Sequence, residues 1–180
     1  MKVIELDKPL TEEEYFIFEE KSELRHEFLN GNLYEMSGIS IFHNDIVSNL
    51  LFLFRTFLKG TDWKLVFESF KIKTSEGNFF YPDIAICYPK IERYFSGQPL
   101  LIVEVLSGNT RKYDLTDKFL QYQKIETLQY YLCVEPEQQV VLFYYKENND
   151  WIAETLTKDE ETISLPALNI SFSLKDIYNS

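Results

Sequence analysis

Apolar and polar residues alternate with two different periods along this chain, and the two periods separate its predicted helices from its strands. Over residues 41–58, apolar side chains such as Ile46, Leu50 and Leu53 recur at helical spacing, and Gly60 can end that helix. Shorter apolar or alternating runs bounded by turn residues predict strands instead. The chain is therefore expected to combine helices with β-sheet.

Capping and turn residues mark the other elements. A capping box that begins at Thr11 predicts a helix to about residue 22, and the Asn-Gly pair at residues 30–31 predicts a β-hairpin. A further helix is expected over residues 113–124, and Ser173 can cap a short final one. Strands are expected in the segments 26–29, 33–36, 63–73 (as one strand or two), 83–88, 100–106, 129–134, 140–146 and 151–156.

The order of these elements predicts the fold class. Two early helices, a run of strands and a helix after the central strands favour an α/β sandwich, with a mixed, mostly antiparallel central sheet flanked by helices. No linker, repeat or low-complexity stretch interrupts the chain, so residues 1–180 are expected to form a single domain. A chain of 180 residues of which 45% are hydrophobic can bury a substantial core.

Composition also bears on where the protein resides. No segment approaches the ~18 consecutive apolar residues of a membrane span, so no membrane association is expected. The N-terminal residues lack the apolar middle of a signal peptide, which favours a cytoplasmic protein. Cys87 and Cys133 fall in apolar, strand-like runs and are expected to be buried free thiols, because no Cys/His cluster typical of zinc accompanies them.

The net charge limits the partners. A formal charge of −11 argues against a tight, non-specific nucleic-acid binder, because phosphate contacts need Lys and Arg side chains. The acidity is concentrated towards the two ends, since residues 1–27 and 147–161 each carry −5, whereas residues 28–146 carry −1. A DNA-facing cleft in the middle of the chain is compatible with this distribution, although no basic stripe marks one.

Glu104 is the most informative residue because it is the only charge in the apolar run 100–106. A carboxylate is rarely buried unless something pairs with it. Asp83 opens a second apolar strand, and Lys118 lies on the helix predicted downstream. Two strand carboxylates and a lysine are the groups that metal-dependent phosphodiester hydrolysis needs.

Each of these residues can be given a role in such a reaction. Neighbouring strands would place Asp83 and Glu104 on one face of the sheet, where they could hold Mg²⁺ with the carbonyl of Val105 as a third ligand. Lys118 would orient the attacking water or stabilise developing charge, because an ammonium group repels a metal cation. Tyr122 lies one helical turn after Lys118, on the same helix face.

The same residues also have structural interpretations. A Pro-Asp pair before a strand is a common way to leave a turn. Glu104 could pair with Arg111 or Lys112, and Lys118 could form an ordinary surface pair with Asp114. Their joint occurrence in this order and spacing favours the catalytic interpretation.

Several stretches of the chain resemble the Uma-type restriction endonuclease family of the PD-(D/E)XK nuclease superfamily. The most specific part is Glu-Val-Leu-Ser at residues 104–107 combined with Asp-x-x-x-Lys at residues 114–118. The superfamily's usual lysine would fall at Leu106, and Lys118 fits a relocation of that lysine to the next helix. The similar stretches span nearly the whole chain and comprise residues 26–37, His43, 81–86, 101–107, 110–122 and 129–136.

The resemblance implies a restriction-endonuclease-like core and a Mg²⁺-dependent endodeoxyribonuclease, with Mn²⁺ as a substitute ion. It also implies that Glu27 joins the metal shell. His43 is a candidate proton carrier, with a structural role as the commoner alternative, and Tyr122 is a candidate accessory residue. Arg111 and Lys112 are candidate phosphate contacts, unless they neutralise nearby charge instead.

Two functions of different classes remain open at this stage. The first is a nuclease that acts on DNA as a homodimer, because the two strands of a duplex need two cuts. The second is a catalytically silent domain that keeps the fold and binds a protein partner, which the acidic net charge favours. An RNA-directed enzyme is a variant of the first, although no RNA-stacking motif is recognisable.

Overall fold

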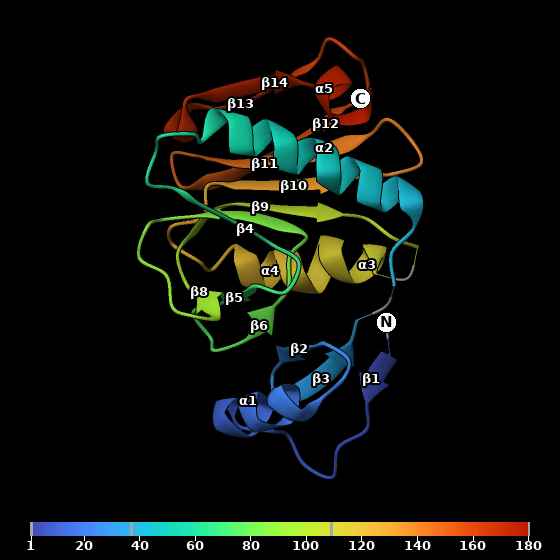
Figure 1. Ribbon diagram of the computed structural model, residues 1–180, viewed down its shortest axis with the longest axis vertical. Helices are drawn as coiled ribbons and strands as arrows, with labels where there is room; N and C mark the ends of the chain where they lie inside the picture. The colour runs from blue at the N-terminus through green and yellow to red at the C-terminus, as the bar shows by residue number, and fades with distance from the viewer. Residues whose placement is uncertain (1, 37, 109, 180) are drawn as a thin grey trace.

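The computed structural model describes residues 2–36, 38–108 and 110–179. Ser37, the last residue of the stretch 26–37 that carries part of the family resemblance, lies outside these ranges. Within them the strands form two six-stranded sheets and one two-stranded sheet. We call the two larger ones the central sheet and the N-terminal sheet, and Figure 1 shows the first in the middle of the molecule.

The central sheet carries most of the hydrophobic core. It consists of β4 (Lys64–Phe67), β7 (Ile84–Cys87), β9 (Pro99–Val105), β10 (Tyr130–Val134), β11 (Val141–Glu147) and β12 (Asp150–Leu156). Their order is β12-β11-β10-β9-β7-β4. Only β9 and β10 are parallel among these described neighbours, so the chain must cross over one face of the sheet between them.

One face of the central sheet is covered by α2 (Ile41–Phe57), the long helix in front of the sheet in Figure 1. Leu50 and Phe54 on α2 share a core cluster with Leu101 and Val103 on β9. Leu50, one of the residues whose spacing predicted an amphipathic helix, thus lies on the stripe that the sheet buries.

The opposite face is covered by the crossover between β9 and β10. This segment comprises α3 (Arg111–Tyr113), a π-helical turn (Asp114–Lys118) and α4 (Phe119–Tyr122). Tyr122 shares a second core cluster with Ile102 of β9. Since successive strand residues point to opposite faces, Glu104 lies on the same side as Ile102 and faces this crossover.

The N-terminal sheet has the order β1-β3-β2-β6-β5-β8. Its strands are β1 (Lys2–Ile4), β2 (His26–Leu29), β3 (Asn32–Glu35), β5 (Lys71–Lys73), β6 (Phe79–Phe80) and β8 (Phe95–Ser96). The first helix, α1 (Glu12–Lys21), packs on it through Tyr15, whose ring stacks on Phe28 and Phe79. Asn30 and Gly31 turn the β2–β3 hairpin with φ angles of 51° and 82°.

The C-terminal segment folds back over α2. It consists of β13 (Thr162–Leu165), a 3-10 turn (Pro166–Leu168), β14 (Ile170–Ser173) and α5 (Leu174–Tyr178). Phe172 meets Phe54 of α2 edge to face, with ring centroids 5.7 Å apart. The hairpin and α5 thereby close the core on the side of the sheet that α2 covers (Figure 1).

The predicted fold class is confirmed, because the structure is a mixed α/β fold with mostly antiparallel sheets and flanking helices. The predicted capping box is present as well: Oγ1 of Thr11 accepts a hydrogen bond from Glu14 N, and Oε2 of Glu14 accepts one from Thr11 N. The segment 63–73 forms two strands in different sheets, since Glu68 has a φ of 55° and turns the chain between them. The strands β1, β6, β8, β13 and β14 were not predicted.

Two further expectations concern the cysteines and the membrane. Cys87 and Cys133 are buried free thiols, as predicted. Burial raises the pKa of the Cys87 thiol to about 12, so its reactive thiolate form is scarce at neutral pH. No helix in the described ranges is long and apolar enough to span a membrane.

Candidate active site

Asp83 and Glu104 face each other from neighbouring strands. β7 pairs with β9 in an antiparallel register that sets Ile84 opposite Val103, so the next position along the register sets Asp83 opposite Glu104. Side chains at opposite positions lie on one face, with Cβ atoms about 5 Å apart. Both residues line a single pocket of about 60 Å³. The structure therefore brings these two carboxylates together.

Two contacts fix the Asp83 carboxylate. Its Oδ2 accepts a hydrogen bond from Val105 N at 2.7 Å, and its Oδ1 lies 3.1 Å from Nε2 of His43. His43 stands in the first turn of α2, where Oγ of the capping residue Ser40 accepts a hydrogen bond from the His43 amide. The start of α2 thus places an imidazole where it orients one of the two pocket carboxylates.

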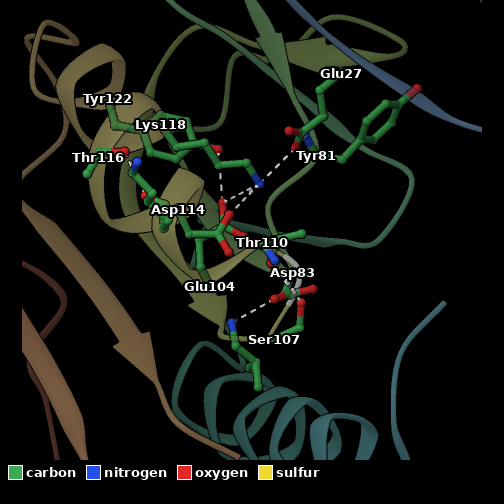
Figure 2. Close-up of polar contacts among 12 residues, drawn as sticks. Glu27, Tyr81, Asp83, Glu104, Ser107, Thr110, Asp114, Thr116, Lys118 and Tyr122 are labelled. Atoms are coloured by element: carbon green, nitrogen blue, oxygen red, sulfur yellow. Dashed lines mark hydrogen bonds and ion pairs between the residues drawn. The ribbon is translucent and has the colours of Figure 1, made fainter. Parts of the chain in front are cut away.

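The ammonium group of Lys118 lies among three carboxylates, as Figure 2 shows. Its Nζ is 2.8 Å from Oε1 of Glu27, 3.1 Å from Oε1 of Glu104 and 3.2 Å from Oδ1 of Asp114. Lys118 is only 5% exposed, and each of its three partners is less exposed still. The interpretation of Lys118 as a surface pair with Asp114 is therefore wrong.

This cluster is acidic overall, because one ammonium group cannot neutralise three carboxylates. Burial raises the pKa of Glu104 well above its usual 4.5, with the charge of Lys118 acting against that shift. Burial raises the pKa of Glu27 in the same way. For Lys118, burial favours a lower pKa, but the three carboxylates outweigh it and raise the pKa well above 10.5. The lysine therefore stays charged.

Glu27 and Tyr122 complete the cluster from two different elements. Oε1 of Glu27, on β2, accepts a hydrogen bond from Tyr81 N at 3.1 Å, while its Oε2 is buried without a hydrogen-bond partner in the described part of the chain. The hydroxyl of Tyr122 donates to Oε1 of Glu104 at 3.2 Å. Because β2 belongs to the N-terminal sheet and Lys118 to the π-helical turn, the contact between Glu27 and Lys118 joins that sheet to the crossover at the site.

The rim of the pocket contains residues that were not predicted as site residues. Ser107 and Thr110 line it, and their hydroxyl oxygens are 2.9 Å apart. Asp114 lines it too, as the third partner of Lys118. A sequence signal existed for two of the three, since Ser107 lies in the Glu-Val-Leu-Ser motif and Asp114 begins the Asp-x-x-x-Lys motif.

The two predicted phosphate contacts are not among the residues that line the pocket. Arg111 forms an ion pair with Glu135, which follows β10, and Lys112 is exposed on α3. Neither Arg111 nor Lys112 pairs with Glu104, as the structural interpretation had considered. The partner of Glu104 is Lys118. Their role in binding nucleic acid stays a prediction.

The raised pKa of Glu27 leads to a prediction about stability. A carboxyl group whose pKa is higher in the folded state than in the unfolded state destabilises the fold as pH rises from 4.5 through the folded pKa. Glu27→Gln removes one such group. The difference in melting temperature between this variant and the native protein should therefore shift in favour of the variant as pH rises above 4.5. Each unit of pKa shift corresponds to about 1.4 kcal/mol.

Melting curves across this pH range, with Glu13→Gln as a control, test the prediction. Glu13 is exposed on α1, so the control should follow the native protein. A pH-independent difference between Glu27→Gln and the native protein would show that burial of Glu27 does not shift its titration.

The protein thus belongs to a class that combines a mixed α/β fold with carboxylates gathered around a buried lysine. The chain belongs to the Uma2 family, described as "Putative restriction endonuclease", which matches residues 12–175. The family resemblance inferred from the motifs is thereby confirmed.

Similar proteins occur in Synechocystis sp. and Anabaena variabilis. The uncharacterised protein slr1290 of Synechocystis sp. is 32% identical over 174 residues, which cover 94% of this chain and 91% of that protein. A second uncharacterised protein of the same organism, sll1609, is 27% identical over 177 residues, covering 94% and 100%. A crystal structure from Anabaena variabilis, described as "a putative nuclease belonging to DUF820", is 19% identical with a TM-score of 0.78, covering 94% of this chain and 98% of that one. That likeness shows a shared fold.

Proposed function

We propose that this protein is a Mg²⁺-dependent endodeoxyribonuclease that hydrolyses phosphodiester bonds in DNA. The observation that carries the proposal is the pocket itself, in which Asp83 and Glu104 face each other next to the buried ammonium group of Lys118. Family membership supports the reaction class. The metal, the substrate and the residue roles are the parts that experiments must test.

The pocket residues fit a magnesium ion. No group of three or more His, Cys, Asp or Glu side chains in the described ranges is arranged to hold a metal alone. Mg²⁺ needs no such group, since it takes one or two carboxylates and keeps several waters. Oε1 of Glu104 is occupied by Lys118 and Tyr122, and no hydrogen bond within the described residues reaches Oε2. Asp83, Glu104 and the Val105 carbonyl are thus the proposed ligands, and Mn²⁺ is a suitable substitute.

The residues around the pocket then have distinct roles. When bound there, Mg²⁺ supplies Lewis-acid chemistry that activates water and neutralises phosphate charge. Lys118 stabilises developing negative charge or orients the attacking water. His43 holds Asp83 in position, and Tyr122 does the same for Glu104. Glu27 acts through Lys118, because its Oε1 is 2.8 Å from the ammonium nitrogen.

DNA would approach across the rim of the pocket. The hydroxyl groups of Ser107 and Thr110 are suited to contact phosphate oxygens, and the exposed Lys112 lies on the same crossover. We propose that two copies act together on a duplex, since each pocket can cut one strand. Light scattering of the protein with and without a DNA duplex would test for the dimer.

A plasmid-nicking assay tests the reaction. Supercoiled plasmid incubated with the protein and Mg²⁺ or Mn²⁺ should be converted to the open-circular form, and chelation of the metal should stop the conversion. Absence of nicking under all conditions with plasmid, linear duplex and single-stranded DNA would reject the proposed activity.

A catalytically silent interaction module is the second candidate, and the acidic net charge of −11 together with the lysine seated among the carboxylates favours it. Metal titration separates the two functions. A nuclease should gain melting temperature with rising Mn²⁺, since a ligand at 100 times its Kd stabilises the fold by about 2.7 kcal/mol. A silent module should show no shift of its melting temperature with Mn²⁺. Asp45→Asn, an exposed substitution on α2, is the control and should respond to Mn²⁺ as the native protein does.

A further inference from the structure

A second and larger pocket lies on the other side of Tyr81, which lines both. It has a volume of about 560 Å³, within the range of small-molecule sites. Its walls come from the end of α1, the segment before β2, the first residue of β5 and the loop before β8, and include Phe16, Arg25, Lys71 and Tyr94. None of the residues with a proposed role in hydrolysis lines it.

Lys71 is the unusual group in this second pocket. It is only 8% exposed, and its ammonium nitrogen lies 5.9 Å, 5.5 Å and 5.0 Å from the ring centroids of Tyr15, Phe16 and Tyr81. No hydrogen bond or ion pair to this nitrogen occurs among the residues that the structure describes. Burial lowers the pKa of Lys71, and the charge of the nearby Glu19 carboxylate opposes that shift without reversing it.

Arg25 brings a second cation to the same pocket. Its side chain is exposed and has no ion pair within the described ranges. It lies near enough to Lys71 for its charge to contribute to the lowered pKa of that lysine. In a chain with a net charge of −11, two neighbouring cations that carboxylates leave unpaired require an explanation.

The acidic residues of the pocket do not provide one. Glu19 already accepts three hydrogen bonds, from the His26 amide, the Tyr81 hydroxyl and Nδ1 of the His26 ring. Glu20 and Glu23 are exposed at the pocket edge, as Arg25 is, so water and salt screen all three of these charges. Glu19 thus lies close enough to Lys71 to attract its charge, but among the described residues it forms no ion pair with either cation, so an anion from solvent can still contact both.

We propose that this pocket binds a phosphate monoester, with Lys71 and Arg25 as its cationic contacts. A phosphate monoester carries nearly two negative charges at neutral pH, which matches one ammonium and one guanidinium group. Phe16 and the 59%-exposed Tyr94 line the pocket beside the two cations. Arg93 lies over the Tyr94 ring, with Cζ 5.1 Å from its centroid, so a nucleotide base would stack on the other face of that ring. The ligand is therefore a free nucleotide or the 5′-phosphorylated end of a DNA strand. The proposal does not depend on hydrolysis at the first pocket.

Calorimetric titration in a phosphate-free buffer with a chelator tests this site without a contribution from metal-bound phosphate. The probes are inorganic phosphate, thymidine 5′-monophosphate, thymidine, and a short single-stranded oligonucleotide with and without a 5′-phosphate. The monophosphate should bind and thymidine should not. Preferential binding of the phosphorylated oligonucleotide would identify a DNA end as the source, whereas binding of the mononucleotide alone would identify a free nucleotide.

Three variants locate the binding. Lys71→Met and Arg25→Gln should each weaken binding of thymidine 5′-monophosphate by ~10-fold or more, on the scale of a lost charged hydrogen bond. Lys73→Met is the matched control on the same strand, because Lys73 is already paired with Glu12 at 2.7 Å, and it should bind like the native protein. Arg25 is exposed, so Arg25→Gln keeps the test valid if Lys71→Met fails to fold. Equal affinity for thymidine and its monophosphate, no binding of any probe, or unchanged affinity in both variants would overturn the proposal.

Discussion

Asp83→Asn is expected to abolish DNA cleavage while leaving the protein folded. The amide keeps the size of the carboxylate and an oxygen that can accept the Val105 hydrogen bond, but it lacks the negative charge that a metal ligand needs. The ring of His43 can adopt the tautomer that accepts a hydrogen bond from the new amide. Because a bound metal contributes several kcal/mol, the nicking rate should fall by ~10³-fold or more.

The initial rate of plasmid nicking in Mg²⁺ measures this effect, and thermal melting checks the fold. Asp117→Asn is the matched control, since Asp117 is exposed on the π-helical turn and its side chain accepts a hydrogen bond from the Thr116 hydroxyl, which an amide oxygen can also accept. It should nick at the native rate. The variant Asp83→Asn should also lose the stabilisation by Mn²⁺, and native nicking in this variant would remove Asp83 from the proposed ligands.

The meeting of Asp83 with Glu104 could be predicted because local rules determine it. Each carboxylate was identified by its place in an apolar strand, and the two-residue period of a strand decides which face a side chain takes. Once the two strands are neighbours, these rules place both carboxylates on the same face of the sheet. The structure agrees, since Ile84 pairs with Val103, which leads Asp83, directly before β7, to the position opposite Glu104, and both carboxylates line one pocket.

The contact between Glu27 and Lys118 could not be derived in this way. Lys118 was identified by the Asp-x-x-x-Lys spacing on the crossover, but Glu27 lies on β2 in the N-terminal sheet. Their meeting depends on how that sheet packs against the crossover, and no local period carries that information. The passage of segment 63–73 from the central sheet to the N-terminal sheet occurs at Glu68, whose positive φ at a non-glycine residue the sequence pattern does not indicate.

Arg111 illustrates the same limit for charges. Its position beside the predicted site suggested a phosphate contact, yet its partner is Glu135, which the sheet brings close from after β10. Spacing along the chain predicts ion pairs within one helix, but it does not predict which distant carboxylate pairs with a surface arginine. A charged residue next to a motif is therefore weaker support for a role than one within the motif.

Lys118→Met is expected to lower stability more than any other substitution in the site. Methionine fills a similar volume but leaves Glu27, Glu104 and Asp114 without their shared cation. Removing one partner of a buried ion pair costs about 3–5 kcal/mol, which urea unfolding would measure. The loss should shrink as pH falls towards 4.5, because burial raises the pKa of Glu104 and Glu27 and the two carboxyls can then take up protons.

The same variant tests the catalytic role of the lysine. Mn²⁺ should still stabilise Lys118→Met, since Asp83 and Glu104 remain, but the nicking rate should fall by ~10²-fold or more. The exposed substitution Lys112→Met should change stability by less than about 0.5 kcal/mol.

A double variant then separates lost charge balance from lost packing. If unpaired charge causes the instability of Lys118→Met, adding Glu27→Gln should restore part of it, so the two effects would be non-additive by about 1 kcal/mol or more. Strict additivity would assign the loss to packing alone. Lys118→Met could instead have the same free energy of unfolding and the same nicking rate as the native protein. The position of Lys118 among three buried carboxylates would then affect neither stability nor catalysis, and the proposed reaction would lose the cation on which it depends.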